Sequence, residues 1–150
     1  MQEFETTRFG TISYNPDHVI TFPQGLIGFE DCSSFHLFHN EEGDRVLYYL
    51  QSLDDSDVSF TLINPVHLNI DYQIALSDTE ISTLEMEGRD DEVTVMLMVY
   101  HGVSVEGESI TAEKGIRAQT QAPLVINPFT RKAIQKPGLK GHLVFTNIDD

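Results

Sequence analysis

The sequence predicts a mainly β protein, a small antiparallel β-barrel-like single domain with one short helix near residues 78–87. Short runs of apolar, β-branched and aromatic residues recur at close intervals between turn signals. The longest such run, VTVMLMVY at Val93–Tyr100, is unbroken and therefore indicates a strand buried on both faces. This spacing favours an antiparallel barrel or sandwich over alternating strand–helix units. The 150 residues fit one domain, 1–150, in which residues 147–150 are expected to fray.

Turn-forming residues separate the candidate strands. Pro23 follows the first run and cannot donate to a strand ladder, and acidic or glycine-containing breaks lie at Glu41–Asp44 and Asp54–Asp57. The candidate strands, in order, are Val19–Phe22, Phe35–Phe38, Val46–Leu50, Val58–Ile63, Val93–Tyr100, Ser109–Ala112, Gly115–Gln119, Leu124–Ile126, Ala133–Lys136 and His142–Phe145.

The predicted helix begins with a capping box, Ser77-Asp78-Thr79-Glu80. In this motif the Ser hydroxyl accepts a hydrogen bond from the Glu amide, and the Glu carboxylate accepts one from the Ser amide. Ile81 and Leu84 supply a narrow apolar stripe, and Gly88 stands where a helix is expected to end.

Acidic residues dominate the charge of the chain. Asp and Glu number 24 against 9 Lys and Arg, a formal net charge of −15. A magnitude of about 2–8 already suffices for the solubility of a small domain. So acidic a surface repels nucleic-acid phosphates and anionic membranes and attracts basic partners. The charge therefore argues against a nucleic-acid binder and a peripheral membrane protein, and favours a protein partner with a basic face.

Other features indicate a soluble cytoplasmic protein. The single cysteine, Cys32, excludes an internal disulfide and a multi-cysteine zinc site, as expected in a reducing compartment. The first residues, MQEFETTRFG, do not resemble a signal peptide. No apolar run approaches the roughly 20 residues that a membrane-spanning helix needs.

The sequence gives little support for a catalytic or metal-binding site. His36 and His39 are three apart in a predicted strand, a spacing that sends side chains to opposite faces. Asp54, Asp55 and Asp57 lack the glycine and distal glutamate of a calcium loop and fit a solvated turn better. Cys32 has no basic neighbour in the sequence. We therefore expect no catalytic residues, no metal and no cofactor. A small metal-dependent hydrolase using His36, His39 and Asp54–Asp57 remains the unfavoured alternative.

Three parts of the chain carry distinctive motifs. The first is TRFG at Thr7–Gly10 with ITFPQGLIGFED at Ile20–Asp31. The second is LQSLDDSDVSFTLINP at Leu50–Pro65 with IDYQIALSD at Ile70–Asp78, and the third is QAPLVINPFTRKAIQ at Gln121–Gln135. In content, order and spacing these motifs resemble the flagellar assembly factor FliW family.

The resemblance implies a cytoplasmic, non-enzymatic protein with a β-barrel-like fold. It implies two alternative protein partners, the translational regulator CsrA and flagellin. Free protein would sequester CsrA by an allosteric mechanism and relieve repression of the flagellin message. When secretion stalls, accumulated flagellin would occupy the protein and release CsrA. We expect a monomer that contacts neither nucleic acid nor membrane directly.

The segment Phe22–Phe29 is the first candidate contact region. Pro23 ends a strand, and two glycines allow a tight loop with positive φ. The residues leave two interpretations open, a loop tucked into the core and an exposed contact loop. The two interpretations are compatible if Phe29 points into the core and anchors the loop while Leu26 faces outward. The apolar candidates for protein binding are Phe22, Leu26, Ile27 and Phe29.

The acidic candidates form two groups along the sequence. One comprises Asp54, Asp55 and Asp57, with Asp71 later in the chain; the other begins with Asp78 and Glu80 and runs to Glu92. An RNA-binding regulator carries Lys and Arg for phosphates, so it offers complementary charge. A direct RNA mimic that occupies the regulator's RNA site remains an alternative to allosteric inhibition.

The third motif contains a predicted core strand and a predicted turn. The strand is Ala122–Asn127, and its apolar content favours burial over partner contact. Thr130-Arg131-Lys132 follows as a hairpin tip with a basic pair, which would balance nearby acids or meet an acidic patch on a partner.

Overall fold

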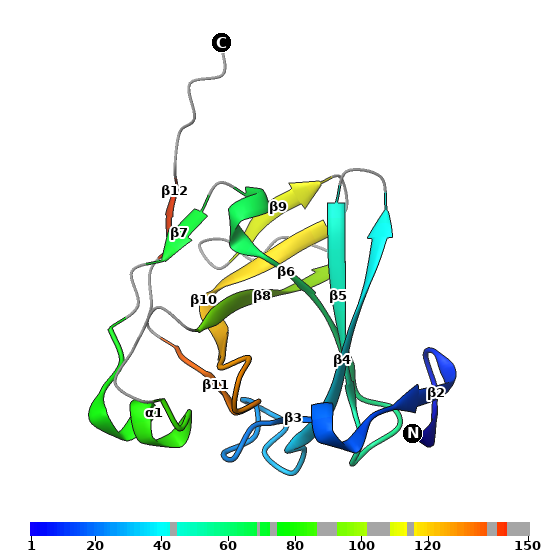
Figure 1. The fold of residues 1–150 in the computed structure, drawn as a ribbon. Coiled ribbons are helices and arrows are strands. Elements are labelled where there is room, and N and C mark those ends of the chain that lie inside the picture. Colours follow the sequence, from blue (N-terminus) through cyan, green and yellow to red (C-terminus); the bar gives the residue numbers. More distant parts are fainter. Residues whose placement is uncertain are drawn as a thin grey trace.

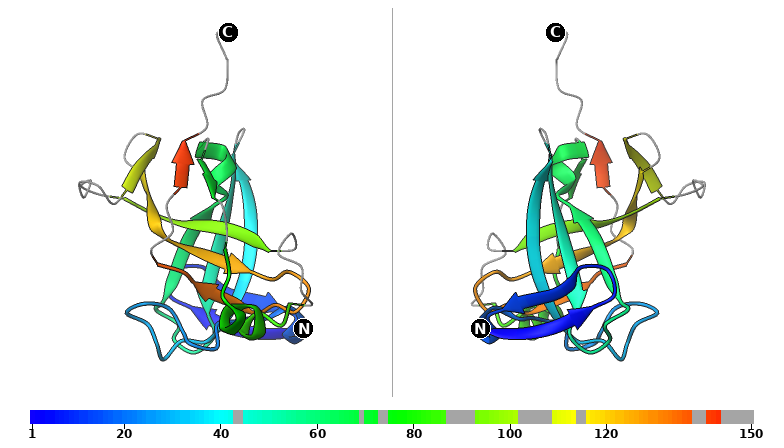
Figure 2. Two further views of the ribbon diagram at one scale, coloured as in Figure 1. Left: turned by 90° about the vertical axis from the view of Figure 1, so that its left-hand side faces the viewer. Right: turned by 90° about the vertical axis from the view of Figure 1, so that its right-hand side faces the viewer.

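A single antiparallel sheet bends round on itself to form the body of the molecule (Figures 1 and 2). Its strand order is β11-β10-β8-β6-β5-β4-β3, and β9 pairs with the outer part of β10. The strands are β3 (Ile20–Thr21), β4 (Ser34–Glu42), β5 (Arg45–Ser52), β6 (Ser59–Ile63), β8 (Thr94–His101), β9 (Ser109–Glu113), β10 (Ile116–Ile126) and β11 (Ala133–Gln135).

This computed structural model describes the backbone of residues 1–42, 45–68, 70–72, 75–86, 93–101, 109–113, 116–137 and 141–143. It describes the side chains of residues 1–39, 47–66, 75–86, 93–99 and 122–137. Predictions for Gly88, for the acids between residues 87 and 92 and for fraying of residues 147–150 therefore lie outside the described residues, as does the side chain of Asp71.

The two edge strands of the sheet, β3 and β11, meet and nearly close the barrel. Thr21 of β3 forms a parallel bridge with Lys132, and the Thr21 amide donates to the Arg131 carbonyl at 2.8 Å. Every other neighbouring pair in the sheet is antiparallel. The predicted mainly β, barrel-like fold is confirmed.

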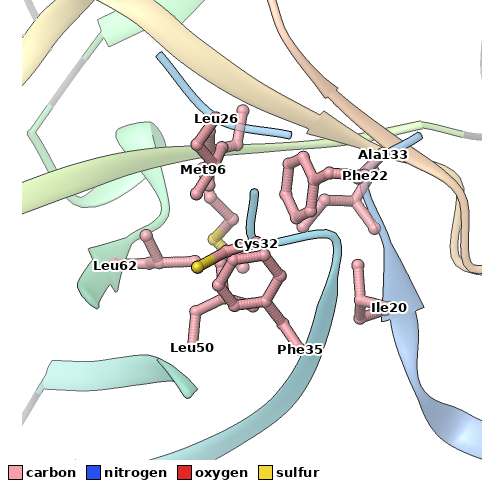
Figure 3. Packing of buried hydrophobic residues seen from close by; sticks show 11 residues of the cluster. Ile20, Phe22, Leu26, Cys32, Phe35, Leu50, Leu62, Met96 and Ala133 are labelled. Atoms are coloured by element: carbon pink, nitrogen blue, oxygen red, sulfur yellow. The ribbon is translucent and has the colours of Figure 1, made fainter. Parts of the chain in front are cut away.

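Large apolar side chains from most of these strands fill the interior (Figure 3). Phe22 and Phe35 are fully buried and pack edge to face, with ring centroids 5.4 Å apart. The other buried members of the cluster are Ile20, Leu26, Cys32, Leu50, Leu62, Met96, Leu124, Ile126 and Ala133. Each fully buried Leu or Phe of this kind stabilises the fold by roughly 1.5–3 kcal/mol relative to exposure.

Strand β8 is buried on both faces at its centre, as the unbroken apolar run predicts. Met96 belongs to the interior cluster. Its neighbour Leu97 points to the opposite face, pairs in register with Ile63 and is also buried.

Two small two-stranded sheets flank the main sheet. β1 (Gln2–Thr6) and β2 (Gly10–Tyr14) form an antiparallel hairpin, and β7 (Ile70–Tyr72) pairs with β12 (Gly141–Leu143). The sequence predicted a strand near His142 but neither the hairpin nor β7. Two short 3-10 helices lie at Pro16–His18 and Pro65–Leu68.

The sequence predicted two strands where the structure has one. Residues 116–119 of the first predicted strand and Leu124–Ile126 belong to one strand, β10, and not to two. The pairing of β10 with β8 shifts register between Gln119 and Leu124. Pro123 falls in this irregular stretch, where its missing amide proton costs no ladder hydrogen bond.

Helix α1 (Asp78–Thr83) has the predicted capping box at its start. The Glu80 amide donates to the Ser77 hydroxyl at 3.1 Å, and the Ser77 amide donates to the Glu80 carboxylate at 2.8 Å. The same carboxylate accepts two hydrogen bonds from Lys136 Nζ, each 2.8 Å long. The salt bridge thus ties the first turn of α1 to the end of β11.

The helix ends earlier than predicted, at Thr83 rather than near residue 87. Leu84 caps it, and Glu85 takes the left-handed conformation, with φ 54°, that Gly88 was expected to supply. The Leu84 carbonyl is held from outside the helix, by Asn127 Nδ2 at 2.9 Å and by the Thr130 hydroxyl at 2.8 Å. Contacts from a distant turn therefore stop the helix.

Asn127 organises the turn that joins β10 to β11. Its side chain is buried, and its Oδ1 accepts hydrogen bonds from the Phe129 amide at 2.9 Å and the Thr130 amide at 3.4 Å. Its backbone closes the turn through Arg131 and Lys132. The predicted burial of Ala122–Asn127 and the predicted tip at Thr130–Lys132 are both confirmed. Within the described residues, the Arg131 Nε donates to the Asp17 carbonyl at 3.2 Å.

Asn127→Ala is expected to lower the free energy of unfolding by about 1–3 kcal/mol, because it leaves buried backbone groups without partners. Denaturant titration measures the loss. Thr130→Val is the matched control, since it removes the second donor to the Leu84 carbonyl and a long, 3.4 Å hydrogen bond from the Lys132 amide but leaves Asn127 in place. A loss for Asn127→Ala no larger than that for Thr130→Val would contradict the central role of Asn127.

The Glu80–Lys136 pair predicts a pH dependence. Partial burial alone would raise the pKa of the Glu80 carboxyl, but hydrogen bonds from Lys136 and Ser77, with the Lys136 charge, outweigh burial and lower this pKa. A lowered pKa in the folded state means that the carboxylate stabilises the fold above its ordinary pKa of 4.5. This contribution is lost as the pH falls below that value and through the folded-state pKa.

Glu80→Gln retains a capping-box side chain but removes the charge. The variant should melt at a lower temperature than the unaltered chain at pH 7, and the gap should shrink at pH 3. Thermal unfolding followed by circular dichroism at both pH values tests this expectation. A gap of the same size at pH 3 would mean that the charge is irrelevant.

Candidate protein-binding site

The connection between β3 and β4, here called the 22–32 loop, is held by its own backbone. The Phe22 amide donates to the Ser33 carbonyl and the Gly25 amide to the Phe22 carbonyl, both at 2.8 Å. Leu26 and Phe29 form an isolated antiparallel bridge in which the Phe29 amide donates to the Leu26 carbonyl at 2.7 Å. The loop is therefore a folded structure with a defined shape.

Glycine is required where this loop folds back on itself. Gly25 has a φ of 70°, and a Cβ atom at this position would lie 2.6 Å from Glu30 Cα. Gly28 has a φ of 86° with open space around it. The predicted positive-φ glycines are confirmed, and Gly25 also permits a close backbone contact that no other residue allows.

The apolar side chains of the loop divide into a buried pair and an exposed pair. Phe22 and Leu26 are buried in the interior cluster. Ile27 is 59% exposed, and Phe29 is 40% exposed with its ring edge to face on Phe60, centroids 5.2 Å apart. The expectation that Leu26 faces outward was wrong: the Leu26–Phe29 bridge turns Leu26 inward and leaves Ile27 at the tip.

A pocket of about 120 Å³ lies between this loop and strand β11. The Ile27 amide reaches across it to donate to Gln135 Oε1 at 2.8 Å. The lining residues are Gln24, Gly25, Leu26, Ile27, Glu30, Ala133, Ile134 and Gln135. The predicted contact loop thus borders a recess whose other wall comes from the third sequence motif.

The acidic turn between β5 and β6, residues 54–57, is attached to the same loop. Asp54 Oδ2 accepts hydrogen bonds from the Ser33 and Ser34 amides, each at 2.9 Å. Asp55 Oδ1 accepts one from the Asp57 amide at 3.0 Å, and the Asp57 carboxylate accepts one from the Thr7 hydroxyl. The carboxylates of Asp54, Asp55 and Asp57 remain exposed. As predicted, they are turn residues, and they add negative charge beside the apolar loop.

The other acidic candidates lie elsewhere on the molecule. Asp78 and Glu80 belong to α1, on the far side of this end of the barrel from the β5–β6 turn (Figure 1). Asp71 lies in β7, at the opposite end of the barrel (Figure 1). The grouping of Asp71 with residues 54–57, made from the sequence, is therefore not found in space. Glu80 is committed to Ser77 and Lys136, whereas Asp78 is exposed.

The histidines and the cysteine do not converge. The His36 ring stacks on Phe38 with centroids 5.2 Å apart, and burial lowers the pKa of the His36 imidazole. The His39 ring lies on the opposite face of the sheet from His36. It contacts Tyr48, which packs against the interior cluster. Cys32 is buried. Among the described residues, no three His, Cys, Asp or Glu side chains lie close enough to hold a metal ion, and no helix is long and apolar enough to span a membrane.

The sequence did not predict the exposure of Phe129 or the contacts of Arg8. Phe129, in the β10–β11 turn, is 73% exposed. The TRFG motif is the turn of the β1–β2 hairpin, and Arg8 lies over the rings of Phe9 and Tyr49, 5.0 and 5.2 Å from their centroids. An aromatic residue next to Asn-Pro in a turn was the available signal for Phe129.

Comparisons with known proteins agree with this geometry. The sequence model of the family described as FliW protein matches residues 3–141. Flagellar assembly factor FliW of Azoarcus sp. (strain BH72) is 40% identical over 135 residues, which cover 89% of each chain. Flagellar assembly factor FliW of Chromobacterium violaceum is 36% identical over 138 residues, covering 91% of this chain and 93% of that one.

A solved structure gives the same result for the fold. The crystal structure of the flagellar assembly factor FliW superposes with a TM-score of 0.70 at 25% identity, covering 98% of this chain and 99% of that one. With its barrel, its loop motif and its β10–β11 turn described above, the chain belongs to the FliW family of flagellar assembly factors.

Proposed function

We propose that this flagellar assembly factor acts in the cytoplasm as a monomer that binds two alternative protein partners and catalyses no reaction. The partners are a CsrA-type translational regulator and flagellin. Bound to the protein, the regulator cannot repress the flagellin message. Flagellin that accumulates when secretion stalls takes its place, and the freed regulator restores repression.

One observation supports a binding role most strongly. At one end of the barrel, a loop held by backbone hydrogen bonds exposes Ile27 and Phe29, and the exposed acidic turn 54–57 is joined to the end of this loop through Asp54. A rigid apolar surface edged by unbalanced charge is suited to a protein partner of the opposite charge.

The net charge of −15 favours the regulator as one of these partners. An RNA-binding protein presents Lys and Arg to phosphates, and those cations attract an acidic protein over long range. The same charge disfavours direct contact of this chain with RNA. Allosteric inhibition and direct mimicry of RNA both agree with the charge, and they differ in whether RNA and this protein can occupy the regulator together.

Size-exclusion chromatography of the chain mixed with the regulator, and separately with flagellin, tests the proposal. A complex is expected with each protein at low salt. Stopped-flow association with the regulator should slow steeply as ionic strength rises, with a smaller change in dissociation, because the Debye length is already only about 10 Å at 0.1 M salt. Failure to form either complex would contradict the proposed function.

A gel-shift experiment with regulator, target RNA and this chain separates the two mechanisms of inhibition. A ternary complex with weakened RNA affinity is expected for allosteric inhibition. Strict competition, with no ternary species at any concentration, would instead establish the RNA-mimic alternative.

A further inference from the structure

We infer that the 22–32 loop and its pocket dock a cationic segment of the translational regulator by inserting one large apolar side chain between the loop and β11. This inference rests on the proposed binding function and specifies the surface and the chemistry it recognises. It concerns Ile27, Phe29, the pocket walls and the carboxylates around them.

The loop is organised before any partner arrives. Its backbone hydrogen bonds, the Gly25–Glu30 contact and the Ile27–Gln135 hydrogen bond fix the position of Ile27. Gly28 is held as well, because its amide donates to Glu30 Oε2 at 3.1 Å. Ordering a mobile loop would weaken binding, so a loop already in place retains more of the contact energy.

The pocket has polar and apolar lining in about equal parts. Leu26, Ala133 and Ile134 supply buried apolar walls, and Ile27 stands exposed at the edge. Gln24, Glu30 and Gln135 supply the polar groups around them. An inserted apolar side chain would cover part of Ile27 and contact the small part of these walls that the pocket exposes, as anchor residues do at the centre of protein interfaces.

The charge around the pocket is negative. Glu30 lines it, Asp31 is the next residue, and Asp54 is bonded to the end of the same loop. Arg45 is the sole Lys or Arg between residues 9 and 88. Arg8 lies in the hairpin turn that is bonded to Asp57 through Thr7, and its guanidinium donates to the Thr61 hydroxyl. Of the cations that follow β10 in the described part of the chain, Lys136 is paired with Glu80 and the Arg131 guanidinium is directed to the Asp17 carbonyl. Lys132 is half-buried beside the barrel closure. A cationic segment therefore matches this surface better than a neutral or acidic one.

Substitution of Ile27 tests the apolar part of the inference. Ile27→Asp places a charge at the pocket edge, and its exposed position predicts an unchanged melting temperature. Val66→Asp is the matched control, because Val66 is also β-branched and is 66% exposed. It belongs to the 3-10 helix Pro65–Leu68, which follows β6 at the opposite end of the barrel (Figure 1). Calorimetric titration with the purified regulator should show at least about tenfold weaker binding for Ile27→Asp and little change for Val66→Asp.

Neutralising the local carboxylates tests the charge. Glu30→Gln with Asp31→Asn removes two charges and retains an acceptor for the Gly28 amide. Glu3→Gln with Glu5→Gln removes two exposed charges from β1 as a control of equal net charge. The loop pair should weaken binding of the same partner about threefold or more at low salt and flatten its salt dependence, while the β1 pair should have a smaller effect.

The outcomes separate the inference from the function on which it rests. If neither protein binds the unaltered chain, the proposed function fails and this inference fails with it. If the regulator binds the unaltered chain, Ile27→Asp and Val66→Asp with equal affinity, the inference alone is overturned. Self-association of the chain that Ile27→Asp abolishes would overturn it too, since the occupant would then be a second copy. Weakened binding that does not depend on the loop charges would also overturn the cationic assignment.

Discussion

Closure of the barrel depends on a turn that is itself held by one buried amide. The Asn127 side chain joins the β10–β11 turn to the end of α1 and leaves Arg131 and Lys132 placed against Thr21. Few backbone hydrogen bonds connect β3 to β11, so the position of this turn matters more than the number of bonds across the seam. A buried amide with satisfied partners specifies a single arrangement, because any other would leave polar groups unpaired in the interior.

The candidate binding surface is a product of that closure. β3 runs directly into the 22–32 loop, and β11 follows the Asn127 turn, so bringing β3 to β11 also brings the loop to the strand that forms the opposite pocket wall. Phe22 and Leu26 secure the loop in the core, and the exposed Ile27 and Phe29 are placed by their buried neighbours. The same residues thus contribute to folding and determine which side chains a partner can reach.

Acidic residues in this protein have two different roles. Glu80 is used internally, for the helix start and the Lys136 salt bridge, and Asp54 holds two backbone amides at the end of the loop. The solvent-facing carboxylates beside Ile27 and Phe29 have few nearby cations, so they contribute to an external field. The charge that can draw in a basic partner and the charge that stabilises the fold are therefore carried partly by different residues, which allows them to be altered separately.

Local patterns in the sequence were sufficient to determine the β class, most strands, the capping box at Ser77 and the glycine loop after Pro23. These features depend on residues close together in the chain. Tertiary contacts decided the rest: the Leu84 carbonyl is captured by Asn127 and Thr130, so α1 ends at Thr83, and an irregular pairing lets one strand pass through Pro123. Packing between distant strands also decides that Leu26, and not Phe29, is buried in the core. The same packing places Asp71 far from residues 54–57. Periodicity carries no information about those meetings, because sequence spacing measures distance along the chain and not across the barrel.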